Sequence, residues 1–236
     1  MKKSLILISN SFGVNLQTYL HQVSLGTDIE YDVGTLYIGG CSLQRHCQNV
    51  ESQEKAYEWF FNGQSTGRYI SIQDALKMQR WDYISLQQVS HLAGIIESYF
   101  PYIKDLYDYV HVYQPQAEII FHKTWPYADN TVHPNFKDYQ NNREVMRICI
   151  DLAVSGVTKY LGINTIIDSG SIINKAYPKY LNELYDSEGF HLSNKGCYLI
   201  ALEAIKCLNP NYQINDVYVP DGFNKDECLK FLEYLK

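Results

Sequence analysis

The chain has 236 residues, with 20 basic against 26 acidic side chains and a net charge of −6. Apolar residues make up 46% and charged residues 19%, which is an ordinary globular composition. It excludes collagen-like, coiled-coil and largely disordered chains. The acidic balance argues against a protein that binds nucleic acid by neutralising phosphates, so we expect no nucleic-acid partner.

Six cysteines are scattered along the chain without a CxxC pair, which favours free thiols in a reducing compartment over a zinc or redox motif. The apolar run at residues 5–8 is too short for a signal peptide. No stretch approaches the ~18 apolar residues that a membrane-spanning helix needs. We therefore expect a cytoplasmic protein without membrane association.

Apolar runs of strand length alternate with longer stretches of helical period. Strands are predicted over residues 4–9, 29–38, 82–87, 117–122 and 164–168. Helices are predicted over residues 12–25, 43–61, 95–113, 136–161 and 193–208, with a short helix from 71 to 76 and a final one from 226 to 235. This order predicts an α/β fold, a three-layer α/β/α sandwich around a mostly parallel five-stranded sheet. No linker divides the chain, so residues 1–236 should form one domain with a C-terminal extension from about residue 210.

Ligands of such sheets bind outside the carboxyl ends of the strands. The segments that follow the predicted strands there carry mainly hydroxyl, amide and glycine residues: 9–11 (Ser-Asn-Ser), 39–42 (Gly-Gly-Cys-Ser), 87–90 (Gln-Gln-Val-Ser), 123–126 (Lys-Thr-Trp-Pro) and 169–170 (Ser-Gly). Neither a GxGxxG nor a GxxxxGK[ST] pattern occurs, which argues against nucleotide binding.

Ser11 stands where a buried strand meets an amphipathic helix, so its hydroxyl is a candidate nucleophile and its own N–H a candidate oxyanion donor. The alternative is that Ser9, Asn10 or Ser11 only caps the helix. Gly40 ends the second predicted strand, and a glycine lets an N–H approach a ligand closely; the alternative is a plain turn.

Gln87 and Gln88 place two carboxamides after the third predicted strand, where an amide N–H suits a developing oxyanion and surface solvation is the alternative. His191 follows Glu188 by three residues in one loop, just before Ser193, a candidate helix cap. A carboxylate so placed can hold the imidazole while its other nitrogen faces a nucleophile. A solvated loop histidine is the alternative.

Together, residues 10–12 (Asn-Ser-Phe), 39–43 (Gly-Gly-Cys-Ser-Leu), 86–88 (Leu-Gln-Gln) and 188–193 (Glu-Gly-Phe-His-Leu-Ser) resemble the four sequence blocks of the SGNH (GDSL-like) hydrolases. More narrowly, they resemble a bacterial branch known as a domain of unknown function, with blocks NSFS, GGCSL, LQQ, TWAY and DGYHLS. Residues 124–127 (Thr-Trp-Pro-Tyr) stand where the TWAY block falls, and the resemblance runs from residue 5 to about residue 208.

The resemblance implies a flavodoxin-like SGNH fold in which Ser11 is the nucleophile and first oxyanion donor, Gly40 the second donor and His191 the base. The family's third donor is an Asn, which this chain lacks, so Gln87 or Gln88 would take its place, with Gln88 slightly favoured.

Three residues depart from the pattern of the family. Glu188 stands at the position of the usual Asp, and Asp186 is the alternative orienting carboxylate. Ser9 replaces a usual glycine, and Gly13 replaces a common serine.

We therefore predict a serine esterase that needs no cofactor and acts on a small ester or an acetylated carbohydrate. Trp125 and Tyr127 are candidate substrate contacts because aromatic rings suit a sugar face, although Trp125 is equally suited to the core. A catalytically silent glycan-binding domain is the alternative, suggested by the missing Asn and by Glu188. A metal hydrolase built on His122, Asp129 and His133 is disfavoured because their spacing lacks the HExxH geometry.

Overall fold

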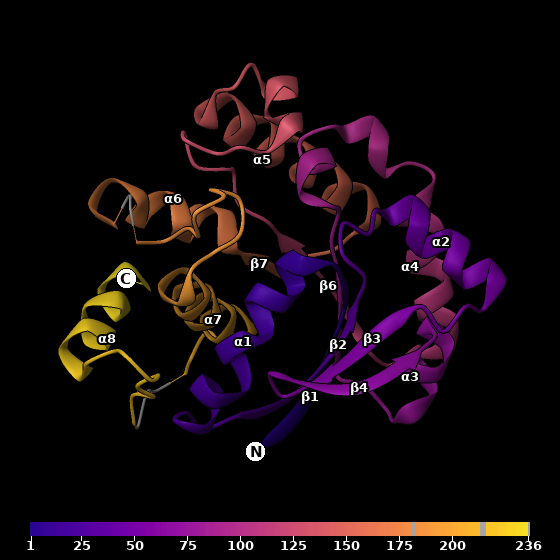
Figure 1. The fold of residues 1–236 in the computed structure, drawn as a ribbon. Coiled ribbons are helices and arrows are strands. Elements are labelled where there is room, and N and C mark those ends of the chain that lie inside the picture. The colour runs from indigo at the N-terminus through magenta and orange to yellow at the C-terminus, as the bar shows by residue number, and fades with distance from the viewer. Residues whose placement is uncertain (181–182, 213–215, 236) are drawn as a thin grey trace.

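The computed structural model describes residues 1–180, 183–212 and 216–235 (Figure 1). Within these residues seven strands form one sheet in the order β4-β3-β2-β1-β5-β6-β7. The strands are β1 (Lys2–Ser9), β2 (Glu30–Tyr37), β3 (Tyr57–Phe61), β4 (Gln64–Ile70), β5 (Tyr83–Leu86), β6 (Glu118–Lys123) and β7 (Ile166–Asp168). Strands β2, β1, β5, β6 and β7 pair in parallel and correspond to the five predicted strands.

Helices cover both faces of the sheet, which confirms the three-layer arrangement. Figure 1 shows α1 (Ser11–Leu25) beside α7 (Asn194–Leu208) on one face, with α6 (Ser169–Tyr180) packed on α7. The opposite face carries α2 (Leu43–Ser52), α3 (Ile72–Met78), α4 (Tyr102–Tyr113) and α5 (Arg143–Leu161), as right-handed crossovers require. The part of the chain that the structure describes also holds four 3₁₀ turns: η1 (Ser90–Leu92), η2 (Ile96–Tyr99), η3 (Pro134–Tyr139) and η4 (Glu233–Leu235).

The central strand β1 anchors the core because both of its faces are covered by helices. Its residues Leu5, Ile6, Leu7 and Ile8 are at most 1% exposed. A parallel strand buried on both faces is expected to be continuously apolar rather than alternating. The apolar run near the N-terminus is therefore this buried strand, and Ser11 follows its carboxyl end directly.

The predicted five-stranded sheet is two strands too small, and the predicted helix over residues 43–61 is too long. Helix α2 ends at Ser52, and residues 57–61 form β3, which pairs antiparallel with β2 and with β4. Tyr57 and Trp59 face the core while Glu58 is half-buried, a period of two that a helix does not show. Asn62 and Gly63 have φ of 49° and 87°, the two-residue hairpin turn that an Asn-Gly pair favours.

Two further helices begin seven residues later than predicted, and one helix has no predicted counterpart. The helix expected over 95–113 begins only at Tyr102, because Pro101 cannot continue a helix that starts before it. The helix expected over 136–161 begins at Arg143, where the Asn142 side chain accepts hydrogen bonds from the N–H groups of Glu144 and Val145. Helix α6 was not predicted at all.

The short helix predicted at 71–76 is confirmed as α3, with a reciprocal capping box between Ser71 and Asp74. The final helix is α8 (Lys225–Leu232), continued by η4. The Phe231 ring lies 5.2 Å from the Tyr180 ring and 6.2 Å from the Tyr198 ring, so the C-terminal extension packs on α6 and α7.

All six cysteines lie in the described part of the chain, and each is a free thiol. None of the helices in the described residues is both long and apolar enough to cross a membrane.

Gly34 in β2 lies against the rings of Trp59 and Trp81. A Cβ at this position would lie 2.2 Å from the Cη2 of Trp59 and 2.9 Å from the Cη2 of Trp81, two buried rings with little room to move. We expect Gly34→Ala to lower the free energy of unfolding by roughly 1–3 kcal/mol in a denaturant titration, as overpacked cores do.

Gly156→Ala in α5 is the matched control for this change. Its Cβ would meet only the terminal methyl of Ile96, at 2.9 Å, and alanine favours the helix by roughly 0.5–1 kcal/mol. This variant should be no less stable than the parent. Equal stability of the two variants would contradict the packing argument.

Candidate active site

The structure brings together two side chains that are far apart in the sequence. Nε2 of His191 lies 2.9 Å from Oγ of Ser11, although the two residues are 180 positions apart. The distance is within the range of a hydrogen bond between a base and a nucleophile. Both side chains are half-buried, so the pair is sheltered but still reachable from solvent.

Asn10 leaves Ser11 free by capping the helix in its place. Asn10 has an extended backbone, and its Oδ1 accepts a hydrogen bond from the N–H of Phe12 at 3.1 Å. Ser11 is thus the first helical residue, whose N–H has no partner within the helix. The hydroxyl and this N–H therefore remain available to a ligand at the positive end of the helix dipole.

Two contacts hold the His191 loop over α1. Asn15 lies one turn after Ser11, and its Oδ1 accepts a hydrogen bond from the N–H of Leu192 at 3.3 Å. The Trp125 ring stacks on Phe12 at 4.1 Å, and its Nε1 donates to the carbonyl of Phe190 at 2.9 Å. Phe12, which follows Ser11, and Phe190, which precedes His191, are thus joined through the Trp125 indole.

Two carboxylates face the other imidazole nitrogen. Nδ1 of His191 lies 3.6 Å from Oδ2 of Asp186 and 3.6 Å from Oε2 of Glu188. Asp186 is the more fixed of the two, since its Oδ1 accepts hydrogen bonds from the N–H groups of Glu188 and Gly189 at 3.0 and 3.1 Å. The Glu188 side chain is 53% exposed against 32% for Asp186. Both distances exceed a hydrogen bond, and such contacts often tighten only when substrate binds.

Gly40 lies at the same edge of the sheet as Ser11. Ser9 pairs with Tyr37 in the parallel β1–β2 register, and Nδ2 of Asn10 donates to the carbonyl of Cys41 at 3.0 Å. Gly40 has a φ of +63°, a left-handed conformation that favours glycine, and its position is exposed. Its N–H has no hydrogen-bond acceptor among the described residues.

Gln88 is not placed as an oxyanion donor, contrary to the expectation from the sequence. Its Oε1 accepts hydrogen bonds from the N–H groups of Leu43 and Val89, at 3.0 and 2.9 Å. Its Nε2 donates to the carbonyl and to the hydroxyl of Ser98, at 3.0 and 3.1 Å. Both amide hydrogens are thus used, and the side chain instead holds the start of α2, just after Gly40.

Gln87 is also directed inward and is only 2% exposed. Its Nε2 donates to Oδ1 of Asn10 at 2.8 Å, and its Oε1 lies 2.8 Å from Nδ1 of His122. Nε2 of His122 lies 2.9 Å from the hydroxyl of Ser169. Burial lowers the pKa of His122 to about 3, so this ring is neutral.

Trp125 and Tyr127 were predicted to contact substrate, but neither is exposed at all. Trp125 is packed on Phe12 and bonded to the carbonyl of Phe190, and the hydroxyl of Tyr127 is 2.8 Å from that of Ser90. The half-exposed rings next to His191 are instead Phe190 and His133, with centroids 5.0 Å apart. Sequence reasoning missed Phe190, because nothing in its local pattern distinguishes a rim from a core.

The residues proposed for a metal hydrolase do not come together. His122 is enclosed by Gln87 and Ser169, while Asp129 accepts a hydrogen bond from the Tyr177 hydroxyl at 2.8 Å. Two other groups among the described residues have ligand atoms within 4.8 Å of one another: His21, Glu30 and Asp32, and Asp186, Glu188 and His191. The second group consists of His191 and the two carboxylates that face its Nδ1.

Ser9 and Gly13, two of the departures from the family pattern, fit each other. A Cβ at Gly13 would lie 2.1 Å from the Oγ of Ser9, so a residue with a side chain there would collide with Ser9. The serine that replaces the usual glycine in β1 is accommodated by the glycine that replaces a common serine in α1.

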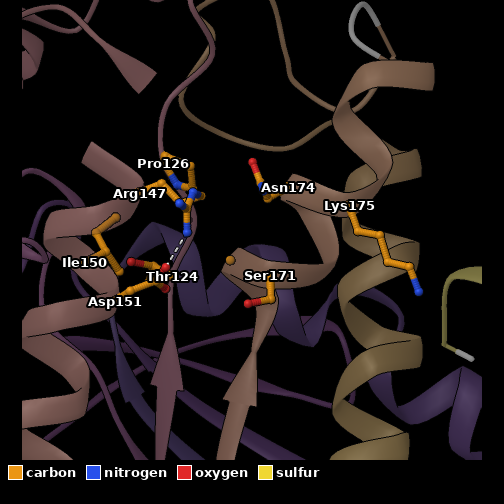
Figure 2. Close-up of a pocket in the computed structure, with 9 residues that line it drawn as sticks. Thr124, Pro126, Arg147, Ile150, Asp151, Ser171, Asn174 and Lys175 are labelled. Atoms are coloured by element: carbon orange, nitrogen blue, oxygen red, sulfur yellow. Dashed lines mark hydrogen bonds and ion pairs between the residues drawn. The ribbon is translucent and has the colours of Figure 1, made fainter. Parts of the chain in front are cut away.

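A separate pocket of about 290 Å³ lies above the carboxyl ends of β6 and β7, between α5 and α6 (Figure 2). It is lined by neither Ser11 nor His191. Its Arg147 donates to Asp151 at 2.6 Å, and Lys175 extends away from the other labelled residues. Because Arg147 also pairs with Glu144, its charge is already balanced within the fold.

The family model for a domain of unknown function, DUF4886, matches residues 4–229. The crystal structure of a DUF4886 family protein from Bacteroides uniformis ATCC 8492 is 31% identical, with a TM-score of 0.91 over 99% of this chain and 93% of that one. No curated protein matches.

More distant structures share the fold. A proposed SGNH hydrolase from Slackia heliotrinireducens is 17% identical, with a TM-score of 0.63 over 89% of this chain and 100% of that one. The acetylxylan esterase Axe2 from Geobacillus stearothermophilus is 13% identical, with a TM-score of 0.55 over 88% and 94%. The sheet and its helices therefore have the SGNH hydrolase fold.

The buried histidines generate a pH prediction. Burial lowers the pKa of His46 and of His122 to about 3, whereas an unfolded histidine titrates near ~6.5. Between these values the unfolded chain binds more protons than the folded one, so stability falls as the pH falls. Each histidine should remove on the order of 2 kcal/mol from the free energy of unfolding between about pH 7.5 and pH 5.

The variant His46→Gln isolates one of these two contributions. Over the same pH range its free energy of unfolding should fall on the order of 2 kcal/mol less than that of the parent. Urea titrations at several pH values measure this difference. An unchanged slope would show that His46 is not buried in its neutral form.

Proposed function

The chain belongs to the DUF4886 family, and we propose that it is a serine hydrolase of carboxylic esters. The observation that carries the proposal is the 2.9 Å contact between Oγ of Ser11 and Nε2 of His191, at the start of a helix. The SGNH hydrolase fold supports the same chemistry.

The proposed reaction begins when Oγ of Ser11 attacks the ester carbonyl carbon and its proton passes to Nε2 of His191. The N–H groups of Ser11 and Gly40 donate to the oxyanion that forms. The C–O bond then breaks, and the leaving alcohol takes the proton from His191. Water activated by the same imidazole hydrolyses the acyl-serine and releases the carboxylic acid.

We propose a small ester as substrate, with an acetylated carbohydrate as the leading candidate. The half-exposed rings of Phe190 and His133 lie beside the dyad and offer flat apolar surfaces on which a sugar ring could pack. An acetylxylan esterase has the same fold, which supports this choice.

Replacing the nucleophile tests the proposal directly. We expect Ser11→Ala to lower the turnover of p-nitrophenyl acetate at least ~10³-fold, since the attacking atom is removed, while circular dichroism and melting stay unchanged. A fluorophosphonate should label the parent at Ser11, as peptide mass spectrometry would show. A parent that is neither labelled nor active would instead favour the glycan-binding domain without catalysis.

The two carboxylates generate a second prediction. We propose that Asp186 and Glu188 share the orientation of His191, with the larger part falling to Asp186 because loop N–H groups fix it. In Asp186→Asn an amide N–H₂ would face Nδ1, which favours the wrong imidazole tautomer. We expect kcat to fall roughly 10²-fold in Asp186→Asn and only a few-fold in Glu188→Gln.

Steady-state kinetics of both single variants and of the double variant distinguish the roles. A larger loss in Glu188→Gln than in Asp186→Asn would return the main role to Glu188. Equal, small losses that combine into a large one would show that either carboxylate suffices.

A further inference from the structure

A buried chain of hydrogen bonds runs beneath the proposed site from α6 to α1. It connects Ser169, His122, Gln87 and Asn10 through contacts of 2.9, 2.8 and 2.8 Å. None of these side chains is more than 2% exposed. These hydrogen bonds run from the end of β6 through the end of β5 to the end of β1, below the edge of the sheet where Ser11 lies.

The hydrogen bond that Asn10 accepts from the backbone determines which atom is the donor in each of these hydrogen bonds. Oδ1 of Asn10 accepts the N–H of Phe12, so it is an oxygen, and the Gln87 atom beside it must be the donor Nε2. Oε1 of Gln87 therefore faces His122, which must carry its hydrogen on Nδ1. Nε2 of His122 then accepts the Ser169 hydroxyl. Only one tautomer of the neutral ring satisfies all four groups.

Asn10 connects this series of buried hydrogen bonds to the backbone on both sides of the site. Its Oδ1 fixes the first turn of α1, which carries Ser11, and its Nδ2 donates to the carbonyl of Cys41, next to Gly40. One amide plane thus sets both the nucleophile turn and the loop of the second oxyanion donor. A rotation of that plane would move the two N–H donors relative to each other.

We infer that His122 is a positioning residue, which acts through Gln87 on the Asn10 amide and so aligns Ser11 with the oxyanion loop. The inference rests on the proposed function of Ser11. His122 does not touch the substrate, and its effect is transmitted by the donor on Nδ1. The loss of this donor should lower kcat, because oxyanion donors must be held within a few tenths of an ångström, and leave KM nearly unchanged.

Two amide substitutions of His122 separate this role from simple core packing. In His122→Asn the amide nitrogen takes the place of Nδ1 and can still donate to Gln87. In His122→Gln the amide reaches instead toward Ser169, and Gln87 loses its donor. Both variants replace one buried polar ring by one buried amide, so a merely structural role predicts similar damage in both.

We expect His122→Gln to lower kcat for p-nitrophenyl acetate roughly tenfold with KM within twofold, while His122→Asn stays within about threefold of the parent in both constants. The rate of fluorophosphonate labelling at Ser11 should fall in parallel. Melting temperatures measured on the same samples give the structural cost. Gln87→Leu should reproduce the loss, and adding His122→Gln to it should lower kcat no further, because the two side chains act in one chain.

Equal kcat values in His122→Asn and His122→Gln would overturn the inference, as would additive losses in the double variant. In both cases the proposed function would stand if Ser11→Ala remains inactive. Turnover retained by Ser11→Ala would overturn the proposed function and the positioning role together.

Discussion

The hydrogen bond between Ser11 and His191 depends on where α1 begins. The helix starts within two residues of the central strand, so Ser11 directly follows a strand whose apolar residues are fully buried. The same helix carries Phe12, which stacks on Trp125, and Asn15, which holds the backbone of Leu192. The loop that precedes α7 is thus fixed onto the first helix at two points, and His191 lies between them.

The groups that surround the nucleophile turn are polar but uncharged. Asn10, Gln87, Gln88 and a neutral His122 satisfy one another or the backbone while buried, which avoids the cost of desolvating an ion. The charged carboxylates stand only on the open side of the loop, where solvent remains.

Much of the fold was predictable because the five parallel strands are short, apolar and bounded by turn residues. The β3–β4 hairpin was missed although Asn62-Gly63 and the alternation of Tyr57 with Trp59 both indicated it, since the helical pattern from residue 43 was extended too far. The sequence does not predict helix α6 because a Ser-Gly pair after a strand is typical of a loop. In the structure Asp168 accepts hydrogen bonds from the N–H and the hydroxyl of Ser171 in the first turn.

At the site, Ser11, Gly40 and His191 could be selected because their segments together resemble the SGNH hydrolase blocks, although each residue alone also allowed a structural interpretation. The roles of Gln87, Gln88 and Trp125 could not be selected, since a carboxamide or an indole at a strand end can point outward or inward. The direction depends on partners far away in the chain, Ser98 for Gln88, His122 for Gln87 and Phe190 for Trp125.

The hydrogen bond between His122 and Gln87 joins two uncharged groups, so acid acts on it differently from an ion pair. Since burial holds the pKa of His122 near 3, mild acid does not protonate the ring within the folded protein, and the bond from Nδ1 to Gln87 persists as long as the fold does. Protons act on His122 only through unfolding, where the exposed ring binds them. The alignment of Ser11 with the Gly40 loop is therefore coupled to global stability rather than to local titration. Acid should remove that alignment in the same cooperative step that unfolds the sheet.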